Sequence, residues 1–277
     1  MRRFAGKVAV ITGAGSGIGR ALSVELARRG ARLALSDVDV VTLAETAALC
    51  EKEGAEVRHY ELDVADRSAV LAHAGTVVGD FGGADLVVNN AGVALVAPVA
   101  RMSWEDLEWV MSIDYWGVVH GTKAFLPHLI ASGDGHLVTI SSVFGLVGVP
   151  TQSAYNSAKF AVRGFTEALR QEMLLERHRV GVTCVHPGGI RTDIVRNARG
   201  ADSGGLRDGF DRIARTTPER AAEIILRGVE RNRPRVLVGA DAYLIDALPR
   251  LLGPLYQRLI VAGVRIANRF GIGLGPY

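Results

Sequence analysis

The chain has 277 residues, of which 48% are hydrophobic and 22% charged, and this composition excludes global disorder. Its formal charge of +3 comes from Lys and Arg residues spread along the sequence, without the charge blocks that mark nucleic-acid-binding arms. No run approaches the roughly 20 uncharged apolar residues of a membrane span. We therefore expect a protein that is soluble or at most peripheral to a membrane, with no nucleic-acid partner.

The cysteines and histidines carry no recognisable framework. Cys50 and Cys184 lack redox or metal-ligand spacing, and the seven histidines form no metal motif. A chain of this length can build its core without disulfides. The sequence therefore predicts reduced thiols, a cytoplasmic location and no bound metal.

Short runs of β-branched residues alternate with longer helical patterns, which is typical of crossover units and a parallel sheet. The predicted strands are 7–12, 31–36, 56–61, 85–89, 136–141, 181–186 and 235–238. The predicted helices are 19–29, 43–53, 67–81, 104–130, 154–176 and 218–231. Because crossovers are right-handed, helices should cover both faces. We expect one α/β domain over 1–277, a Rossmann-type doubly wound sheet of about seven parallel strands with its site beyond their carboxyl ends.

Two segments differ from this pattern. Residues 193–217 are rich in glycine and arginine at a strand end, which indicates either a loop over the substrate side of the site or a solvated surface connection. Residues 240–277 form a predicted C-terminal helical extension in which leucines recur at helical intervals among arginines. We expect this extension to pack within a homodimer or homotetramer; a cover for the pocket or a peripheral membrane contact is the alternative.

A glycine-rich turn follows the first predicted strand and opens a helix. Its members are Gly13, Ser16, Gly17, Ile18 and Gly19. Such a turn lets the backbone approach a diphosphate closely, and the helix N-terminus supplies donors and a partial positive charge. The same glycines could also serve a purely structural turn.

Asp37 ends the second predicted strand, about 20 residues after the glycines. A carboxylate there can accept hydrogen bonds from ribose hydroxyls and repel a 2′-phosphate, which favours NAD over NADP as the cofactor. The alternative is that Asp37 caps the next helix. Arg20 is a weaker candidate for a phosphate contact.

With these features the chain resembles the classical short-chain dehydrogenase/reductase family over roughly residues 5–240. The resemblance is carried by the glycine turn, by single residues and pairs after the later strands, and by one helical pair: Asp63-Val64, Asn89-Asn90-Ala91-Gly92, Ser142, Tyr155 with Lys159, and Pro187-Gly188. It implies that Asp63 and Val64 border the adenine and that Asn90, Ala91 and Gly92 form the wall beside it. It also implies that 187–192 hold the nicotinamide, with Ile190 and Thr192 as contacts.

Tyr155 and Lys159 are four residues apart in a helical pattern, so their side chains share one face. A tyrosine has a pKa near 10, and lowering it by about 3 units needs roughly 4 kcal/mol, to which a nearby ammonium contributes. The resemblance implies that Tyr155 exchanges a proton with the substrate, that Ser142 hydrogen-bonds the substrate oxygen, and that Lys159 also holds the nicotinamide ribose. We therefore predict hydride transfer between NAD and a substrate alcohol or carbonyl.

Asp114 departs from the family pattern, which usually has asparagine there to hold a water in a proton relay. An ionised carboxylate accepts hydrogen bonds but cannot donate them, and its charge favours a protonated Tyr155. Three outcomes are open: a working relay, which we favour, a slower enzyme with a raised pH optimum, or a silent NAD-binding protein that acts through partners. Asp114 could also be an ordinary polar residue of a long helix.

The substrate class is suggested by the loops expected to line the pocket. Residues 93–99 and 143–150 are almost wholly apolar, which suits a small hydrophobic secondary alcohol or ketone. The same loops could instead pack on neighbouring helices.

Overall fold

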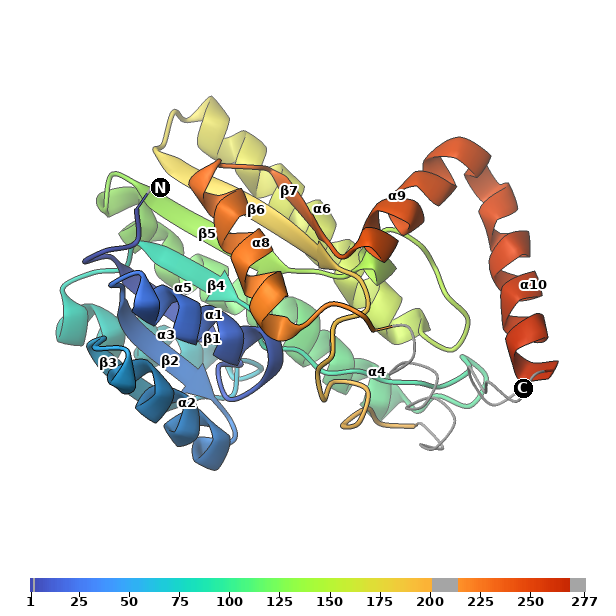
Figure 1. The fold of residues 1–277 in the computed structure, drawn as a ribbon, viewed down its shortest axis with the longest axis horizontal. Helices are drawn as coiled ribbons and strands as arrows, with labels where there is room; N and C mark the ends of the chain where they lie inside the picture. Colours follow the sequence, from blue (N-terminus) through green and yellow to red (C-terminus); the bar gives the residue numbers. More distant parts are fainter. Residues whose placement is uncertain (2, 201–213, 270–277) are drawn as a thin grey trace.

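The computed structural model describes residues 1, 3–200 and 214–269. It contains one sheet of seven parallel strands in the order β3-β2-β1-β4-β5-β6-β7 (Figure 1). The strands are β1 (Val8–Thr12), β2 (Arg32–Asp37), β3 (Val57–Glu61), β4 (Leu86–Asn89), β5 (Gly135–Ile140), β6 (Val180–Pro187) and β7 (Arg235–Val238). The predicted doubly wound α/β fold is confirmed, and strand ends differ from prediction by one residue at most, within the usual fraying of ends.

Helices cover both faces of the sheet. The first layer holds α1 (Gly17–Arg28), α2 (Val40–Lys52) and α8 (Pro218–Glu230), with α1 and α8 in front of the sheet in Figure 1. The opposite layer holds α3 (Arg67–Phe81), α5 (Gly117–Ala131) and α6 (Ser153–Leu175). Each layer buries its own hydrophobic cluster against the sheet.

The central strands are buried on both sides, which explains their continuous apolar runs. In β1, Ile11 packs into the cluster under α1 and α8, whereas its neighbour Val10 packs into the cluster under α3 and α5. Val88 and Val87 of β4 divide in the same way. Because successive side chains of a strand point to opposite faces, one short run of sequence supplies both cores.

The chain reverses its winding at β1, which pairs with β2 on one side and β4 on the other. In doubly wound sheets the crevice beyond this point is the usual ligand site. The glycine turn, the end of β2 and the end of β4 therefore meet at one edge of the sheet.

The predicted helix 104–130 is interrupted. It consists of α4 (Trp104–Met111), a π-helical turn, η1 (Ser112–Trp116), and then α5. Asp114 lies in that π turn and is fully buried. Single π turns widen a helix locally and are frequent at functional sites. Hydrophobic periodicity does not report such an insertion, because the apolar stripe continues on either side of it.

The described part of the C-terminal extension comprises α9 (Ala240–Leu252), η3 (Gly253–Leu255) and α10 (Tyr256–Arg269). In Figure 1, α9 leaves the sheet beside β7, and α10 runs back at a distance from the sheet. Residues 270–277 of the predicted extension and 201–213 of the predicted loop lie outside the described residues. Among the residues that the structure describes, no helix is long and apolar enough to cross a membrane.

Candidate active site

The glycine turn between β1 and α1 is built by close backbone approaches. Gly13 and Gly17 have φ values of 64° and 52°, in the left-handed region that favours glycine. A Cβ on Gly13 would lie 2.8 Å from the Cα of Ala91, and a Cβ on Gly19 would collide with the Gly13 carbonyl oxygen. The turn therefore has no room for side chains at Gly13 and Gly19. Because the backbone is this compact, the first residues of α1 lie at the cavity.

The end of β4 is tied to this turn. The Nδ2 of Asn90 donates to the carbonyl oxygens of Thr12 and Gly13 at 2.9 and 3.0 Å. The Oγ1 of Thr12 accepts from the backbone N–H groups of Asn90 and Ala91 at 3.0 and 3.1 Å. Ser16 precedes α1 in an extended conformation without a capping hydrogen bond from its side chain. The first turn of α1 therefore keeps backbone donors for an anion.

Asp37 faces the glycine turn from the end of β2. Its Oδ2 accepts from the N–H of Gly15 at 2.8 Å, and its Oδ1 accepts from the N–H of Asp39 at 3.1 Å. Asp39, not Asp37, is the N-cap of α2 and accepts from Val41 and Thr42. The alternative interpretation of Asp37 as a helix cap is therefore wrong.

The guanidinium of Arg20 contacts α2 and does not line the cavity. Its guanidinium donates to Thr46 Oγ1 at 2.9 Å and to the Thr42 carbonyl at 3.2 Å, and it pairs with Glu45 at 3.0 Å. These contacts join α1 to α2. Arg20 is thus a link between two helices of one layer.

One cavity of about 580 Å³ collects nearly all of the predicted site residues. Those that line it are Gly13, Ser16, Gly17, Ile18, Asp37, Asp63, Val64, Asn90, Ala91, Gly92, Ser142, Tyr155, Lys159, Pro187, Gly188, Ile190 and Thr192. Gly19 and Asp114 do not line it: Gly19 lies within the turn, and Asp114 lies behind Lys159. The volume is in the range of small-molecule and cofactor sites.

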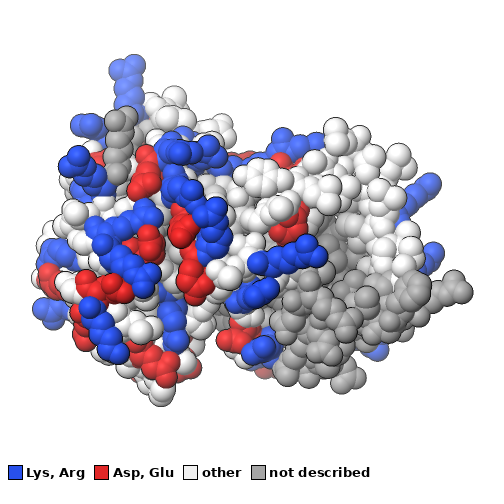
Figure 2. Space-filling model, in the orientation of Figure 1, with Lys and Arg blue, Asp and Glu red and all other residues white. Residues whose placement is uncertain are grey.

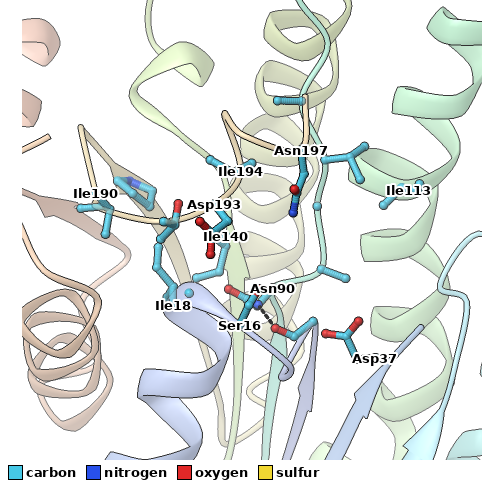
Figure 3. Close-up of a pocket in the computed structure, with 18 of the residues that line it drawn as sticks. Ser16, Ile18, Asp37, Asn90, Ile113, Ile140, Ile190, Asp193, Ile194 and Asn197 are labelled. Carbon is cyan, nitrogen blue, oxygen red and sulfur yellow. Dashed lines mark hydrogen bonds between the residues drawn. The ribbon is translucent and has the colours of Figure 1, made fainter. Parts of the chain in front are cut away.

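Several lining residues were not singled out from the sequence. Ile194 and Asn197 come from the segment after β6 and lie across the cavity from Ser16 and Asp37 (Figure 3). That segment is held to the loop after β4, because the N–H of Arg199 donates to the Ala94 carbonyl at 3.0 Å. The described part of the predicted loop 193–217 thus borders the site. Its glycine content indicated a loop, but nothing in it indicated which side chains face inward.

Asp241 is a second residue that sequence reasoning missed. Its carboxylate accepts from the N–H of Gly189 at 2.7 Å, and a Cβ on Gly188 would collide with it. Thr192, in the same loop after β6, lies 3.1 Å from where a Cβ on Gly17 would be. Asp241 therefore helps to hold the 187–192 segment over the glycine turn. Its place after the last strand of a parallel sheet was the available signal.

Ser142, Tyr155 and Lys159 meet at the opposite end of the cavity. Ser142 follows β5, and Tyr155 and Lys159 lie one turn apart on α6, with the ammonium 5.4 Å from the centre of the tyrosine ring. The Oγ of Ser142 accepts from the N–H of Phe144 at 3.1 Å, and the nearby Ser142 side chain lowers the pKa of Tyr155. All three residues of the predicted set therefore line the same cavity.

The ammonium group of Lys159 contacts two oxygen-bearing groups, the carbonyl of Ile140 and the carboxylate of Asp114. Its Nζ donates to the carbonyl of Ile140 at 3.2 Å and lies 3.0 Å from an Oδ2 of Asp114. The other carboxylate oxygen of Asp114 accepts from the N–H of Val93 at 2.7 Å. Both Lys159 and Asp114 are buried, at 3% and 0% exposure of their side chains. The Oδ1 of Asp114 is therefore hydrogen-bonded, whereas its Oδ2 makes no hydrogen bond to a described residue and meets Lys159 only as an ion pair at close distance.

This arrangement sets opposing influences on proton affinity. Burial raises the pKa of Tyr155, the Lys159 ammonium lowers it, the Asp114 carboxylate raises it again, and the net pKa is above the usual value. Burial lowers the pKa of Lys159, but Asp114 and Tyr155 more than offset that effect and raise it. The pKa of Asp114 is raised by burial, against the effects of Lys159 and the Val93 N–H. Asp114 thus acts on the tyrosine through charge rather than contact.

Comparison with known proteins agrees with this geometry. The family model for short-chain dehydrogenases matches residues 7–203. SadH of Mycobacterium tuberculosis, whose name assigns it to the oxidoreductases, is 58% identical over 268 residues, covering 95% of this chain and 97% of its own. The chain therefore belongs to the short-chain dehydrogenase/reductase family and is an oxidoreductase of that family, whose members use NAD or NADP.

Two further proteins are similar to this chain over most of its length. Mouse estradiol 17-beta-dehydrogenase 11 is 32% identical over 260 residues, covering 94% of this chain and 84% of its own. A crystal structure of a Burkholderia phymatum short-chain dehydrogenase/reductase in complex with NAD superimposes with a TM-score of 0.84 at 31% identity, covering 90% of this chain and 95% of that one.

The buried ion pair generates a stability prediction. Asp114→Ala should leave the Lys159 ammonium buried without its counter-ion and should lower the free energy of unfolding by roughly 3–5 kcal/mol, measured by urea denaturation at neutral pH. Adding Lys159→Met should recover much of that loss, because no buried charge then remains unpaired. The control is Asp134→Ala, whose carboxylate is 55% exposed and pairs with the amine of the buried Met1; its loss should cost less than about 1 kcal/mol, because water solvates the carboxylate. Equal losses for Asp114→Ala and Asp134→Ala would contradict this account.

Proposed function

We propose that the protein is an NAD-dependent oxidoreductase that interconverts a hydrophobic secondary alcohol and its ketone, with Tyr155 as general acid and base. One observation carries the proposal: Ser142, Tyr155 and Lys159 line the same cavity as the glycine turn. Proton-transfer groups and a diphosphate cradle are thereby brought to one chamber, as hydride transfer with a dinucleotide requires.

The residues present fit a dinucleotide. The glycine turn is a cradle that a Cβ would fill, and the first turn of α1 keeps donors for a diphosphate. Asp37 at the rim favours NAD, because its carboxylate accepts from hydroxyl groups and repels a 2′-phosphate. We assign the nicotinamide end to 187–192 and Lys159. A bound nicotinamide supplies the hydride acceptor for oxidation and the hydride donor for reduction.

The protein groups then handle the proton. In oxidation, the phenolate of Tyr155 takes the proton of the substrate hydroxyl while Ser142 donates a hydrogen bond to the same oxygen; in reduction, Tyr155 returns the proton. Lys159 favours the phenolate through its charge. Lys159 is itself held by Ile140 and Asp114, so its ammonium stays fixed below the ring.

A hydrophobic substrate is supported by the cavity wall. Val93, Ala94 and Ile113 line it, together with Ile194 from the segment after β6. The loop 143–150 contributes less than the sequence indicated: none of its residues is among the described residues that line the cavity, and Val143, Leu146 and Val147 are buried instead. The relationship to an estradiol dehydrogenase is consistent with an apolar alcohol as substrate.

A catalytically silent NAD-binding protein is the second candidate, favoured by one observation. Asp114 places a negative charge beside Lys159 and so works against the tyrosinate. We favour the enzyme, because Ser142, Tyr155 and Lys159 are all in place. The homodimer or homotetramer and the cytoplasmic location remain predictions, the latter supported by two buried thiols that form no disulfide.

Tyr155→Phe tests the enzyme against the silent protein. With NAD and a panel of hydrophobic secondary alcohols, turnover followed by reduced-nicotinamide absorbance should fall about 10²–10⁴-fold, while NAD binding measured by calorimetry is retained. Tyr60→Phe is the matched control, since the Tyr60 hydroxyl bonds Asp80 away from the cavity. Undiminished turnover in Tyr155→Phe would remove Tyr155 from the mechanism, and a wild type inactive toward every alcohol and ketone would favour the silent protein.

Asp114→Asn should shift the pH profile of alcohol oxidation toward lower pH. The carboxylate is one of the causes that raise the pKa of Tyr155, so its removal lowers that pKa and provides phenolate at lower pH. The measurement is kcat/KM against pH for wild type and variant. Asp134→Asn, on the surface, should leave the profile in place. A shift of the Asp114→Asn profile to higher pH would show that the carboxylate assists proton removal.

Asp37→Ala tests the cofactor. Loss of the carboxylate should reduce the preference for NAD over NADP by about tenfold or more, because a hydrogen-bond acceptor and a charge repulsion are removed together. The ratio of kcat/KM for the two cofactors is the readout. Asp66→Ala, which removes the N-cap of α3, should lower stability but not change that ratio. An unchanged ratio in Asp37→Ala would exclude a role for Asp37 in cofactor choice.

A further inference from the structure

The C-terminal arm, which we define as residues 240–269, is firmly attached at its beginning. Ala242 is fully buried, and Asp241 accepts from the N–H of Gly189. Asp246 pairs with Arg235 of β7 at 3.1 Å. Beyond α9 the arm turns at η3, and α10 then runs apart from the sheet (Figure 1). The arm is therefore anchored to the domain at its first residues, and its later part projects from the domain without joining either helical layer.

Large apolar side chains of the arm are exposed. Six of them are more than half exposed: Tyr243, Leu244, Leu251, Leu255, Leu259 and Ile266. Leu251 is 81% exposed. Figure 2 shows white, uncharged surface over much of this side of the molecule, in contrast to the mixed charges over α1 and α8. Several large apolar side chains exposed along one segment are a feature of surfaces that bind another molecule or a membrane.

The second feature of the arm is its charge. Arg258 and Arg265 are seven residues apart, two helical turns, and therefore lie on one side of α10. Leu259 and Ile266 repeat with the same spacing on an adjacent side. Neither arginine forms an ion pair within the part of the chain that the structure describes, and the sequence of α10 contains no Asp or Glu. The exposed apolar stripe thus runs beside unneutralised positive charge.

We propose that the C-terminal arm binds the surface of an anionic lipid bilayer. In this arrangement Leu251, Leu255 and Leu259 enter the boundary between head groups and acyl chains, while Arg258 and Arg265 contact lipid phosphates. A helix with Leu259 and Ile266 along one side and Arg258 and Arg265 along the adjacent side has the chemistry of an interfacial helix. The arm lies on the surface and does not cross it, since no described helix is long and apolar enough to do so.

Charge favours this partner over a second copy of the arm. Two α10 helices packed through their apolar stripes would bring unpaired arginines together and would supply no carboxylate to neutralise them. A surface of anionic lipid offers apolar depth and negative charge at once. The bilayer therefore satisfies both features of the arm, whereas a second arm satisfies only one.

The arm contacts the segment that follows Ser142, so membrane binding by the arm would also affect the position of that segment. The hydroxyl of Tyr256 accepts from the N–H of Gly148 at 3.3 Å, and α9 packs near η2 (Val143–Gly145), directly after Ser142. A bound arm would hold this segment toward the lipid. The segment directly after Ser142 would then lie beside the bilayer, and the relevance of that position to an apolar substrate rests on the proposed function.

The test uses the full chain and sedimentation with phosphatidylcholine vesicles, with or without phosphatidylglycerol. The wild type should sediment with the anionic vesicles, less so at high salt, and weakly with phosphatidylcholine alone. Arg258→Ala/Arg265→Ala should weaken partition to anionic vesicles by roughly tenfold or more. Leu251→Ser/Leu259→Ser should weaken it by at least as much.

Matched controls place the same substitutions elsewhere on the surface. Arg67→Ala/Arg231→Ala and Leu49→Ser/Leu71→Ser change exposed residues outside the arm and should sediment like wild type. Absence of wild-type sedimentation with anionic vesicles, or equal sedimentation of arm variants and wild type, would overturn the proposal. So would self-association, measured by analytical ultracentrifugation without vesicles, that the leucine variant abolishes while vesicles bind nothing. Turnover of a soluble alcohol, measured on the same preparations, separates a failure of this proposal from a failure of the proposed function.

Discussion

The buried ammonium of Lys159 is the constraint around which the site is arranged. An unpaired charge at 3% exposure would be too costly to keep, so the fold surrounds it with the Ile140 carbonyl at the end of β5 and the Asp114 carboxylate. Asp114 in turn takes the N–H of Val93 from the loop after β4. Two strand ends, the π turn and α6 are therefore joined through one charge, and Tyr155 is placed in its field.

The groups around Tyr155 act on its pKa in opposite directions. Lys159 favours the tyrosinate, whereas burial and Asp114 favour the neutral phenol. A neutral asparagine in place of Asp114 would leave the lysine charge uncompensated toward Tyr155, so the carboxylate trades some activation of the tyrosine for a secure burial of the ammonium. Asp114 lies in the π turn, and this local distortion of the helix places its carboxylate beside the Lys159 ammonium.

The part of the cavity around the glycine turn is shaped by close backbone packing rather than by buried charges. Gly13 lies against Ala91, and Asn90 holds both the turn and the end of β1, so the ends of β1 and β4 meet without intervening side chains. The loop after β6 closes from the other side, held by Asp241 of α9. The arm that carries the exposed leucines and arginines begins at the same α9. The beginning of the arm and the segment 187–192 of the site are thus in direct contact, through the hydrogen bond from Gly189 to Asp241.

The sequence by itself determined the fold class and the strands to within a residue, because parallel strands leave continuous apolar runs and their carboxyl ends converge on one edge. Most of the cavity lining followed from the resemblance of its motifs to the short-chain dehydrogenase/reductase family. Tertiary structure alone decided what depends on contacts between distant segments. It showed that Asp37 faces Gly15 while Asp39 caps α2, that helix 104–130 contains a π turn, and that Asp241 holds Gly189. It also showed that Val143, Leu146 and Val147 are buried in the core. Periodicity reports which face of an element is apolar. It does not report what that face meets, and this is why the leucines of the arm were visible in the sequence while their exposure was not.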